Sequence, residues 1–239
     1  MVKQIGFALL LVLTAAATAV IRAPAAWVGQ WLESRTPFRL IDARGTVWHG
    51  SALLGVSDGR QTTLAPGRLE WRVDSPLSVR ISHPWLREPL EVSVAPQKKG
   101  FAKGTARVPA AMLAAAGAPF NTLRPAGILE INWTDAVLGG AGLAGQVQID
   151  WREAQSAVST VAPLGTYRLR LTGAGQRAVL ELETLSGPLR MQGNGTWESG
   201  RVRFNGVATA EPGMQGALNG LLGLLGRRSG DKVLLAIGS

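Results

Sequence analysis

The sequence of 239 residues contains no cysteine, which excludes disulfide bonds, thiolate nucleophiles and zinc sites built on cysteine. Histidine is also scarce: His49 and His83 are the only two, which leaves little material for a histidine-rich metal site. Charged residues make up 17% of the chain, whereas hydrophobic residues make up 46% and can form a sizeable core. Thirty glycines and thirteen prolines favour many short elements over long helices.

The formal net charge is +9, because 25 Lys and Arg outnumber 16 Asp and Glu. The basic residues are scattered at strand-like spacing, as in Arg68 and Arg72 or Arg168 and Arg170, and form no block. A nucleic-acid-binding protein usually presents a clustered basic face or a recognisable motif. The sequence therefore gives no reason to expect nucleic acid as a partner, and attraction to anionic lipid headgroups fits the charge at least as well.

An apolar run opens the chain, with no charge between Ile5 and Ile21. As a helix it would be roughly 25 Å long, near the lower limit for a bilayer core of about 30 Å. It is either a retained anchor, with Lys3 on the cytoplasmic side, or a cleaved signal peptide with Ala17-Thr18-Ala19 as the cleavage site. Its length favours retention, because signal peptides carry a shorter apolar stretch. The expected anchor residues are Ile5, Phe7, Leu9, Leu10, Leu11, Val12, Leu13, Val20 and Ile21.

We expect an anchor over residues 1–22, a juxtamembrane helix over 23–37 and an exported β-rich domain over 38–239. Pro24 and Pro37 delimit the short helix. Its Trp27 and Trp31 are four residues apart and share a face. Two interpretations stay open: the indoles lie in the lipid headgroup region, or they pack on the domain that follows.

From Leu40 onward, apolar and polar residues mostly alternate with a period of two. This pattern is typical of antiparallel strands with one buried and one wetted face. Turns rich in Gly, Pro and Asp separate the runs, which indicates an extended meander or roll. The clearest runs are 68–73, 128–133, 145–151, 166–171, 178–185 and 201–208, and the apolar segment 232–237 is expected as a closing strand.

Gly-Thr and a tryptophan occur together twice, in "GTVWHG" at 45–50 and "GTWESG" at 195–200. We interpret both as turns or bulges between strands, because glycine supplies the turn and β-branched residues favour the strand. The tryptophans that end alternating runs would cover the open end of the sheet interior while their N–H groups reach a partner.

Two helices are expected to pack on the sheet, over 108–123 and 213–228. The second carries a leucine stripe through Leu218, Leu221 and Leu222, although its internal glycines weaken it. The stripe indicates core packing or a lid over the apolar face of the sheet. It is too short and too rich in glycine for a second membrane span.

The sequence has no catalytic motif in the structural setting that the motif requires. Gly140-x-Gly142-x-x-Gly145 matches a dinucleotide fingerprint in letters, but the residues after it are strand-like and offer no helix N-terminus. His49 follows Trp48 in a turn, and no nucleophile motif accompanies it. We expect no enzyme activity, no cofactor and no metal.

In their order and spacing, these segments resemble protein N of the bacterial type II secretion system (GspN) across essentially the whole chain. The most specific elements are Gly45-Thr46-x-Trp48-x-Gly50, the Pro-Ala-Gly of 125–127 before a strand, and the strand that ends at Trp151. The residues expected to carry the signature or its structure are Gly45, Thr46, Trp48, Gly50, Trp71, Pro125, Gly127, Trp133, Trp151, Gly195, Thr196 and Trp197.

The resemblance implies a non-enzymatic, single-pass inner-membrane accessory component of the secretion system, with its bulk in the periplasm. Its partners would be the inner-membrane platform or the secretin, together with inner-membrane lipids, and its role would be assembly or scaffolding for export of folded proteins. The family's kinship with AsmA-like envelope proteins implies a mainly β fold: a long, curved antiparallel sheet that forms a groove. The alternative is a lipid-binding or lipid-transfer module. The leucine stripe would fill the groove of a scaffold and would be displaced from that of a lipid carrier.

Overall fold

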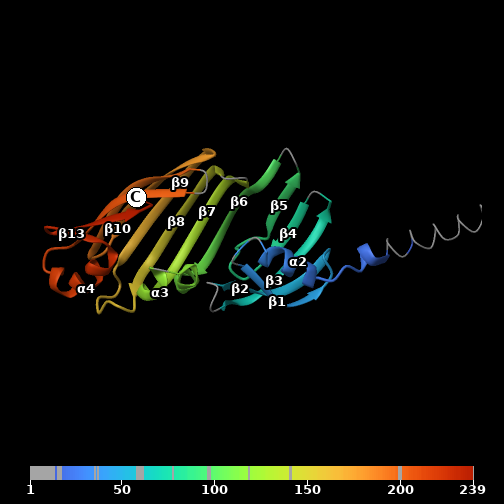
Figure 1. Cartoon of the computed structure of the whole chain (residues 1–239), viewed down its shortest axis with the longest axis horizontal. Coiled ribbons are helices and arrows are strands. Elements are labelled where there is room, and N and C mark those ends of the chain that lie inside the picture. Colours follow the sequence, from blue (N-terminus) through green and yellow to red (C-terminus); the bar gives the residue numbers. More distant parts are fainter. Residues whose placement is uncertain are drawn as a thin grey trace, which may run out of the picture. The chain divides into compact units, whose positions relative to one another are not determined.

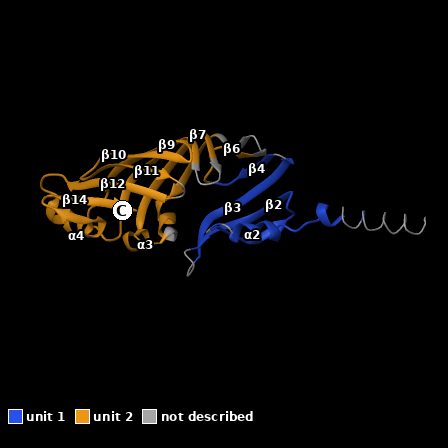
Figure 2. Cartoon of the chain, turned by 45° about the horizontal axis from the view of Figure 1, so that its top comes forward, with its two compact units in different colours: residues 1–84 blue, residues 85–239 orange. Residues whose placement is uncertain are grey.

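A computed structural model of the chain describes residues 14, 18–34, 36, 38–57, 62–76, 78–95, 98–117, 119–139, 142–198 and 201–238. The chain forms two compact units, residues 1–84 and 85–239 (Figure 2). Of the expected anchor residues, Ile5 through Leu13 lie outside the described residues, whereas Val20 and Ile21 are helical and exposed. No helix within the described ranges is both long enough and apolar enough to cross a bilayer. The anchor and the domain boundaries at 22 and 37 stay predictions.

Unit 1 is a four-stranded antiparallel sheet covered by one helix, in the order β1-β2-β3-β4. The helix packs through Val28 and Leu32 on a core that includes Leu40 and Trp71. The elements are α2 (Ala26–Glu33), β1 (Phe38–Gly45), β2 (His49–Ser57), β3 (Thr62–Ser75) and β4 (Ser78–Ser82).

The opposite side of α2 faces outward, because Trp27 and Trp31 are 57% and 58% exposed. The interpretation that these indoles pack on the following domain is therefore wrong. The helical spacing of four residues does place both on one side, as expected.

Unit 2 is an antiparallel meander in the order β5-β6-β7-β8-β9-β10-β11-β12-β14-β13. In Figure 1 the helices α3 and α4 lie at the same end of its strands. The elements are β5 (Leu90–Ala95), β6 (Lys98–Pro109), the 3-10 helix η1 (Ala110–Ala116), α3 (Phe120–Leu123), β7 (Pro125–Gly139), β8 (Gly142–Ser156), β9 (Gly165–Gly175), β10 (Arg177–Ser186), β11 (Leu189–Glu198), β12 (Arg201–Ala210), α4 (Gln215–Leu225), β13 (Arg227–Ser229) and β14 (Lys232–Ile237).

All the alternating runs named above lie within strands, so the prediction of a mainly β, antiparallel fold is confirmed. The helices differ from expectation. The segment 108–123 is not one helix: Val108 and Pro109 still belong to β6, and the remainder divides into η1 and α3. The division falls at Gly117, because its φ of +84° is incompatible with a right-handed helix. The second helix ends at Leu225, and Arg227–Ser229 becomes β13 because it pairs with β14.

Candidate functional site

The "GTVWHG" segment holds the chain that leads out of the apolar N-terminal run. The Trp48 Nε1–H donates to the Val20 carbonyl (2.8 Å), and the Val47 amide donates to the Ala23 carbonyl (2.9 Å). The Ala25 amide in turn donates to the Gly45 carbonyl (3.1 Å). These three hydrogen bonds attach residues 20–25 to the turn between β1 and β2. We call this arrangement the N-terminal clamp.

The turn is itself fixed to the sheet of unit 1. The Trp71 Nε1–H donates to the Val47 carbonyl (3.1 Å), and the Val73 amide donates to the Trp48 carbonyl (2.8 Å). Gly50 lies opposite Trp71, and a Cβ on it would come within 2.4 Å of the indole. Gly45 has φ +88°, a conformation that favours glycine. The predicted turn is therefore confirmed.

The second Gly-Thr-Trp copy has a different structure. Gly195, Thr196 and Trp197 all lie inside β11, and Gly195 pairs with Phe204 of β12. Trp197 packs beside the small core of Ala136, Leu143 and Ala178. β11 ends at Glu198 and pairs there with Arg201, the first residue of the antiparallel strand β12, so the segment 195–200 joins two strands as predicted. The copies differ in position: Gly-Thr-Trp lies at the turn in the first and inside β11, before the turn, in the second.

Two other signature elements meet in unit 2. Gly127 has φ +101° at an irregularity of β7, where the Arg152 and Glu153 carbonyls would be 2.6 Å from a Cβ. The Trp151 Nε1–H donates to the Ala126 carbonyl (2.9 Å), and Pro125 before it is buried. The expectation that a strand ends at Trp151 is wrong, because β8 continues to Ser156. The Trp151 indole instead links β8 to the Pro-Ala-Gly segment of β7. Trp133 lies further along β7 beside the Leu143 core.

One face of the unit 2 sheet is apolar, and α4 covers one end of it. Leu218, Leu221 and Leu222 are 0%, 3% and 7% exposed. They pack in the core formed with Tyr167, Leu189, Ala208 and Val233. The Tyr167 hydroxyl donates to the Leu189 carbonyl (3.0 Å), and burial raises the pKa of this phenol above its ordinary range. The predicted leucine stripe therefore fills this end of the apolar face.

A band of the same face lies between the α4 core and the Leu143 core. Ile131, Ile149 and Leu169 occupy paired positions on β7, β8 and β9. All three are partly exposed, and none belongs to a cluster of buried residues among the described ones. This band is apolar surface that water still reaches.

The other face of unit 2 carries ion pairs between neighbouring strands. Glu130 of β7 accepts from Arg107 of β6 and from Arg152 of β8, with the latter pair at 2.6 Å. Arg170 of β9 pairs with Glu183 of β10 at 2.8 Å. Most of these groups are well exposed, so each pair contributes at most about 1 kcal/mol.

Asp150 is the buried member of this face, at 4% exposure. Arg168 donates to both carboxylate oxygens, with Nε–Oδ1 at 2.7 Å and Nη2–Oδ2 at 2.8 Å. Hydrogen bonds from Arg168 lower the pKa of the Asp150 carboxyl below its ordinary value. A two-point arginine–carboxylate pair fixes the register of β8 and β9.

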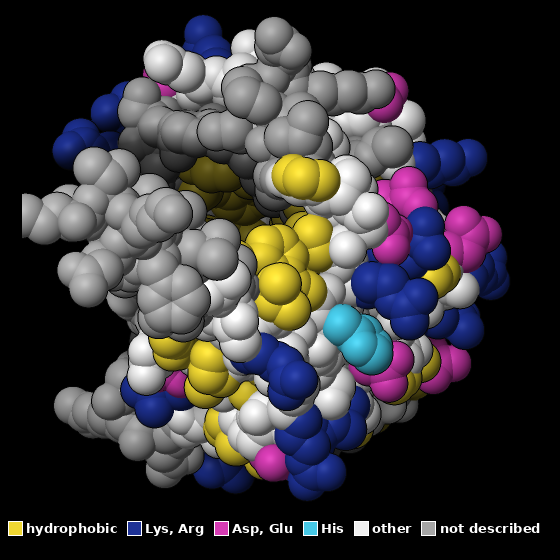
Figure 3. Space-filling view, turned by 90° about the vertical axis from the view of Figure 1, so that its right-hand side faces the viewer, with side chains coloured by type: hydrophobic (Ala, Val, Ile, Leu, Met, Phe, Trp, Pro, Cys, Tyr) yellow, Lys and Arg dark blue, Asp and Glu magenta, His cyan; other side chains and the backbone are white. Residues whose placement is uncertain are grey.

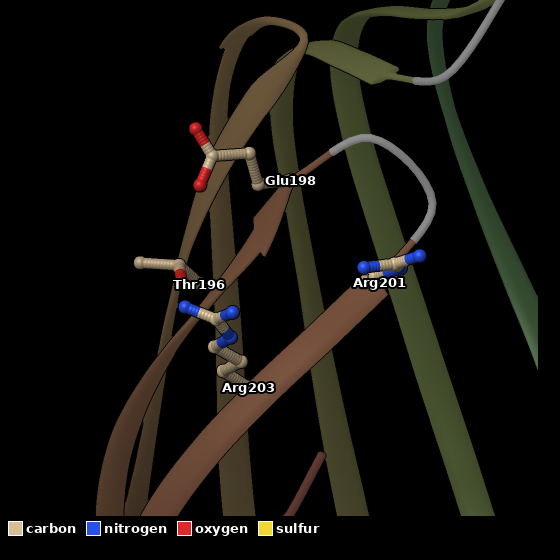
Figure 4. Close-up of a pocket in the computed structure, with 4 residues that line it drawn as sticks. All are labelled: Thr196, Glu198, Arg201 and Arg203. Atoms are coloured by element: carbon tan, nitrogen blue, oxygen red, sulfur yellow. The ribbon is translucent and has the colours of Figure 1, made fainter. Parts of the chain in front are cut away.

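The concave sites on the surface are shallow and offer little chemistry. One has a volume of about 280 Å³ and is lined by Thr196 and Glu198 of β11 and Arg201 and Arg203 of β12 (Figure 4). In Figure 4, Arg203 lies beside Thr196. These two residues and Glu198 are on one side of the site, and Arg201 is on the other. No ion pair joins Glu198 to either arginine among the residues described.

The histidines lie apart from any catalytic group. His83 is buried, and burial lowers its pKa, whereas His49 is exposed next to the clamp. Within the described residues, no cluster of His, Asp and Glu could hold a metal ion. Gly142 and Gly145 lie in β8, which confirms that the glycine-rich segment joins two strands and precedes no helix.

Among known protein families, a family model described as type II secretion system (T2SS), protein N, matches residues 37–234. No curated protein and no solved structure matches the chain. The matched region includes β1 through β13 and the first half of β14, and with them the residues expected to carry the family signature.

Proposed function

We propose that this chain, which belongs to the type II secretion system protein N family, is a non-enzymatic accessory component that acts in assembly or scaffolding at the inner membrane. Family membership places it with the secretion machinery. The scaffolding role, the single-pass anchor and the periplasmic location of residues 38–239 are our proposal. The partners would be other secretion components, in the inner-membrane platform or the secretin.

The packing of α4 carries this proposal. An apolar face that the chain covers with its own helix favours a scaffold, whereas a lipid carrier whose helix is displaced would leave that end of the face open to an acyl chain. Leu218, Leu221 and Leu222 are buried against the sheet. Burying such side chains stabilises the docked helix by about 1.5–3 kcal/mol each. A lipid that displaced α4 would have to replace all three contacts.

The free edge of unit 1 offers a surface for a protein partner. β1 pairs only with β2 among the described strands of this unit, so one side of its backbone remains available. Phe38 and Ile41 on this strand are 41% and 38% exposed. An extended segment of a partner could add to residues 38–41 by strand pairing. The irregularity after Ile41 limits this edge to a short length.

A second candidate is lipid binding, and the band of Ile131, Ile149 and Leu169 favours it. An acyl chain on these residues would cover apolar surface that no helix covers among the residues described. This site would hold lipid while α4 stays docked.

In-cell crosslinking tests the scaffold. A photoreactive residue at Arg39, at the β1 edge, should yield a discrete adduct with another secretion component. The same group at Glu181, exposed on the inner strand β10, is the matched control and should not. Native mass spectrometry of the detergent-extracted protein tests the second candidate. Two results together would contradict the scaffold proposal and support a lipid-binding module. Phospholipid would co-purify with the wild type but not with the I149D variant, and the photoreactive residue at position 39 would give no protein adduct.

A further inference from the structure

The outward side of α2, the segment before it and Trp48 of the β1–β2 turn expose large apolar side chains on unit 1. Val20 and Ile21 are 56% and 64% exposed, Trp27 and Trp31 are 57% and 58% exposed, and Trp48 is 41% exposed. Figure 3 shows a face on which hydrophobic side chains gather near the centre, with most of the charged side chains to the right of and below them. We call these five residues the tryptophan patch.

We propose that the tryptophan patch lies in the headgroup region of the bilayer and that the N-terminal clamp holds it there. The inference rests on the membrane location in the proposed function and deepens it. The patch therefore binds a lipid surface, mainly through the indoles of Trp27 and Trp31.

The argument begins with continuity along the chain. The patch follows the uncharged run Ile5–Ile21 without a break, and Val20 and Ile21 belong to both. If that run enters a bilayer, the residues next to it must lie near the membrane surface. Arg22 comes at this junction and is exposed, where a cation meets anionic headgroups favourably.

The second step is residue chemistry. Tryptophan is enriched at membrane interfaces because its ring is apolar while its N–H can hydrogen-bond to headgroups and water. On α2, Val28 and Leu32 pack against the core of unit 1, whereas Trp27 and Trp31 are not among the residues of that core and are more than half exposed. Two large indoles four residues apart on an exposed helix face are costly in water and favourable at an interface.

The third step is rigidity. A flexible linker would let α2 leave the membrane surface, but the clamp ties residues 20–25 to the β1–β2 turn by the three hydrogen bonds given above. Pro24 also pairs with Thr46 as an isolated bridge. Since α2 begins directly after this segment, its orientation relative to the end of the apolar run is fixed. The Gly45-Thr46-x-Trp48 signature then has a role: it sets how the domain sits on its membrane.

The test uses the full chain reconstituted in vesicles of phosphatidylethanolamine and phosphatidylglycerol. A nitroxide that quenches tryptophan fluorescence is attached to the lipid either near the headgroup or at the chain end. Because the chain has eight tryptophans, the signal of the patch is taken as the difference between the wild type and the W27F/W31F variant. Trp197→Phe, in unit 2, is the matched control for loss of one indole.

We expect the difference signal to be quenched strongly by the headgroup label and weakly by the chain-end label, and the W197F difference to be quenched by neither. A difference signal untouched by both labels, in protein that floats with the vesicles, would overturn the patch and leave the membrane location intact. Such a result would assign the surface to a protein partner instead. Failure of the full chain to float would overturn both. Unchanged circular dichroism of W27F/W31F guards against loss of the fold.

Discussion

Gly104 of β6 lies directly opposite Trp133 of β7, and the indole covers the glycine so closely that a Cβ would come within 2.2 Å of its ring. Gly50 and Trp71 stand in the same relationship in unit 1. In each case an aromatic ring fills the space above a glycine on the neighbouring strand. The missing side chain of one residue is therefore part of the packing of the other.

The substitution Gly104→Ala should destabilise unit 2, because the indole of Trp133 must move out of its place beside the Leu143 core. We expect a loss of about 1–3 kcal/mol in the free energy of unfolding, as for other overpacked sites. Denaturant unfolding followed by tryptophan fluorescence would measure it. An unchanged midpoint would show that the indole is free to shift.

The substitution Gly220→Ala should have the opposite sign and serves as the control for a glycine without a covering ring. Gly220 lies inside α4, is exposed, and has open space where its Cβ would be. Alanine is favoured over glycine within a helix by about 1 kcal/mol. A higher unfolding midpoint is expected, and a lower one would mean that α4 is not helical at this position.

The substitution Leu218→Ala should reveal how firmly α4 is docked. This leucine is fully buried, and removing it should cost about 2–4 kcal/mol. Leu224, on the same helix, is 52% exposed, so Leu224→Ala should cost about 0.5 kcal/mol or less. Equal effects of the two variants on the free energy of unfolding would contradict the orientation of α4.

Asp150 should make stability depend on pH in the acid range. Its pKa is lowered in the folded state, so its stabilisation is complete above the unfolded pKa of about 3.9 and is lost as the pH falls through the lower folded value. Asp150→Asn should cost about 2 kcal/mol at neutral pH, since Arg168 is partly exposed and water compensates some of the loss. Chemical denaturation at several pH values should show the gap between wild type and variant close in acid. Glu181→Gln, at an exposed site, should leave no such gap.

Tyr167 is the one tyrosine of the chain and can be titrated by its phenolate absorbance. Burial raises its pKa, so the folded state keeps the phenol neutral at a pH near 10, where an unfolded tyrosine ionises. This raised pKa contributes stability that is complete below about pH 10 and is lost as the pH rises above it. Phenolate should therefore form together with the loss of the circular dichroism of the fold. Titration with an ordinary midpoint in folded protein would contradict the buried position.

Alternation along the sequence predicted the strands correctly where one face of the sheet is apolar and the other polar. β9 and β12 are good examples, since residues 166–171 and 201–208 lie inside them. The helices were less predictable. Alanine-rich 110–123 has helical composition, but Gly117 and the pairing of β6 with β7 restrict it to a 3-10 helix and one short α-helix.

The repeated Gly-Thr-Trp phrase shows the limit of local pattern. Both copies join two antiparallel strands, but Trp48 lies in its turn, whereas Trp197 still pairs with β10 and β12 and the chain reverses only after Glu198. Nor did the sequence decide which side of α2 faces outward. In the structure Val28 and Leu32 pack against the core of unit 1, and Trp27 and Trp31 are exposed.

By itself the sequence determined the mainly β character, the antiparallel connectivity and the expectation of the secretion family, because these depend on periodicity and motif order along the chain. Tertiary structure alone decided that α4 fills one end of the apolar face, that Asp150 pairs with Arg168, and that the β1–β2 turn clamps residues 20–25. Each of these joins residues far apart in sequence, or sets one face of an element against another. Such contacts depend on which surfaces the fold brings together, so the helix and strand propensities of the individual segments do not predict them.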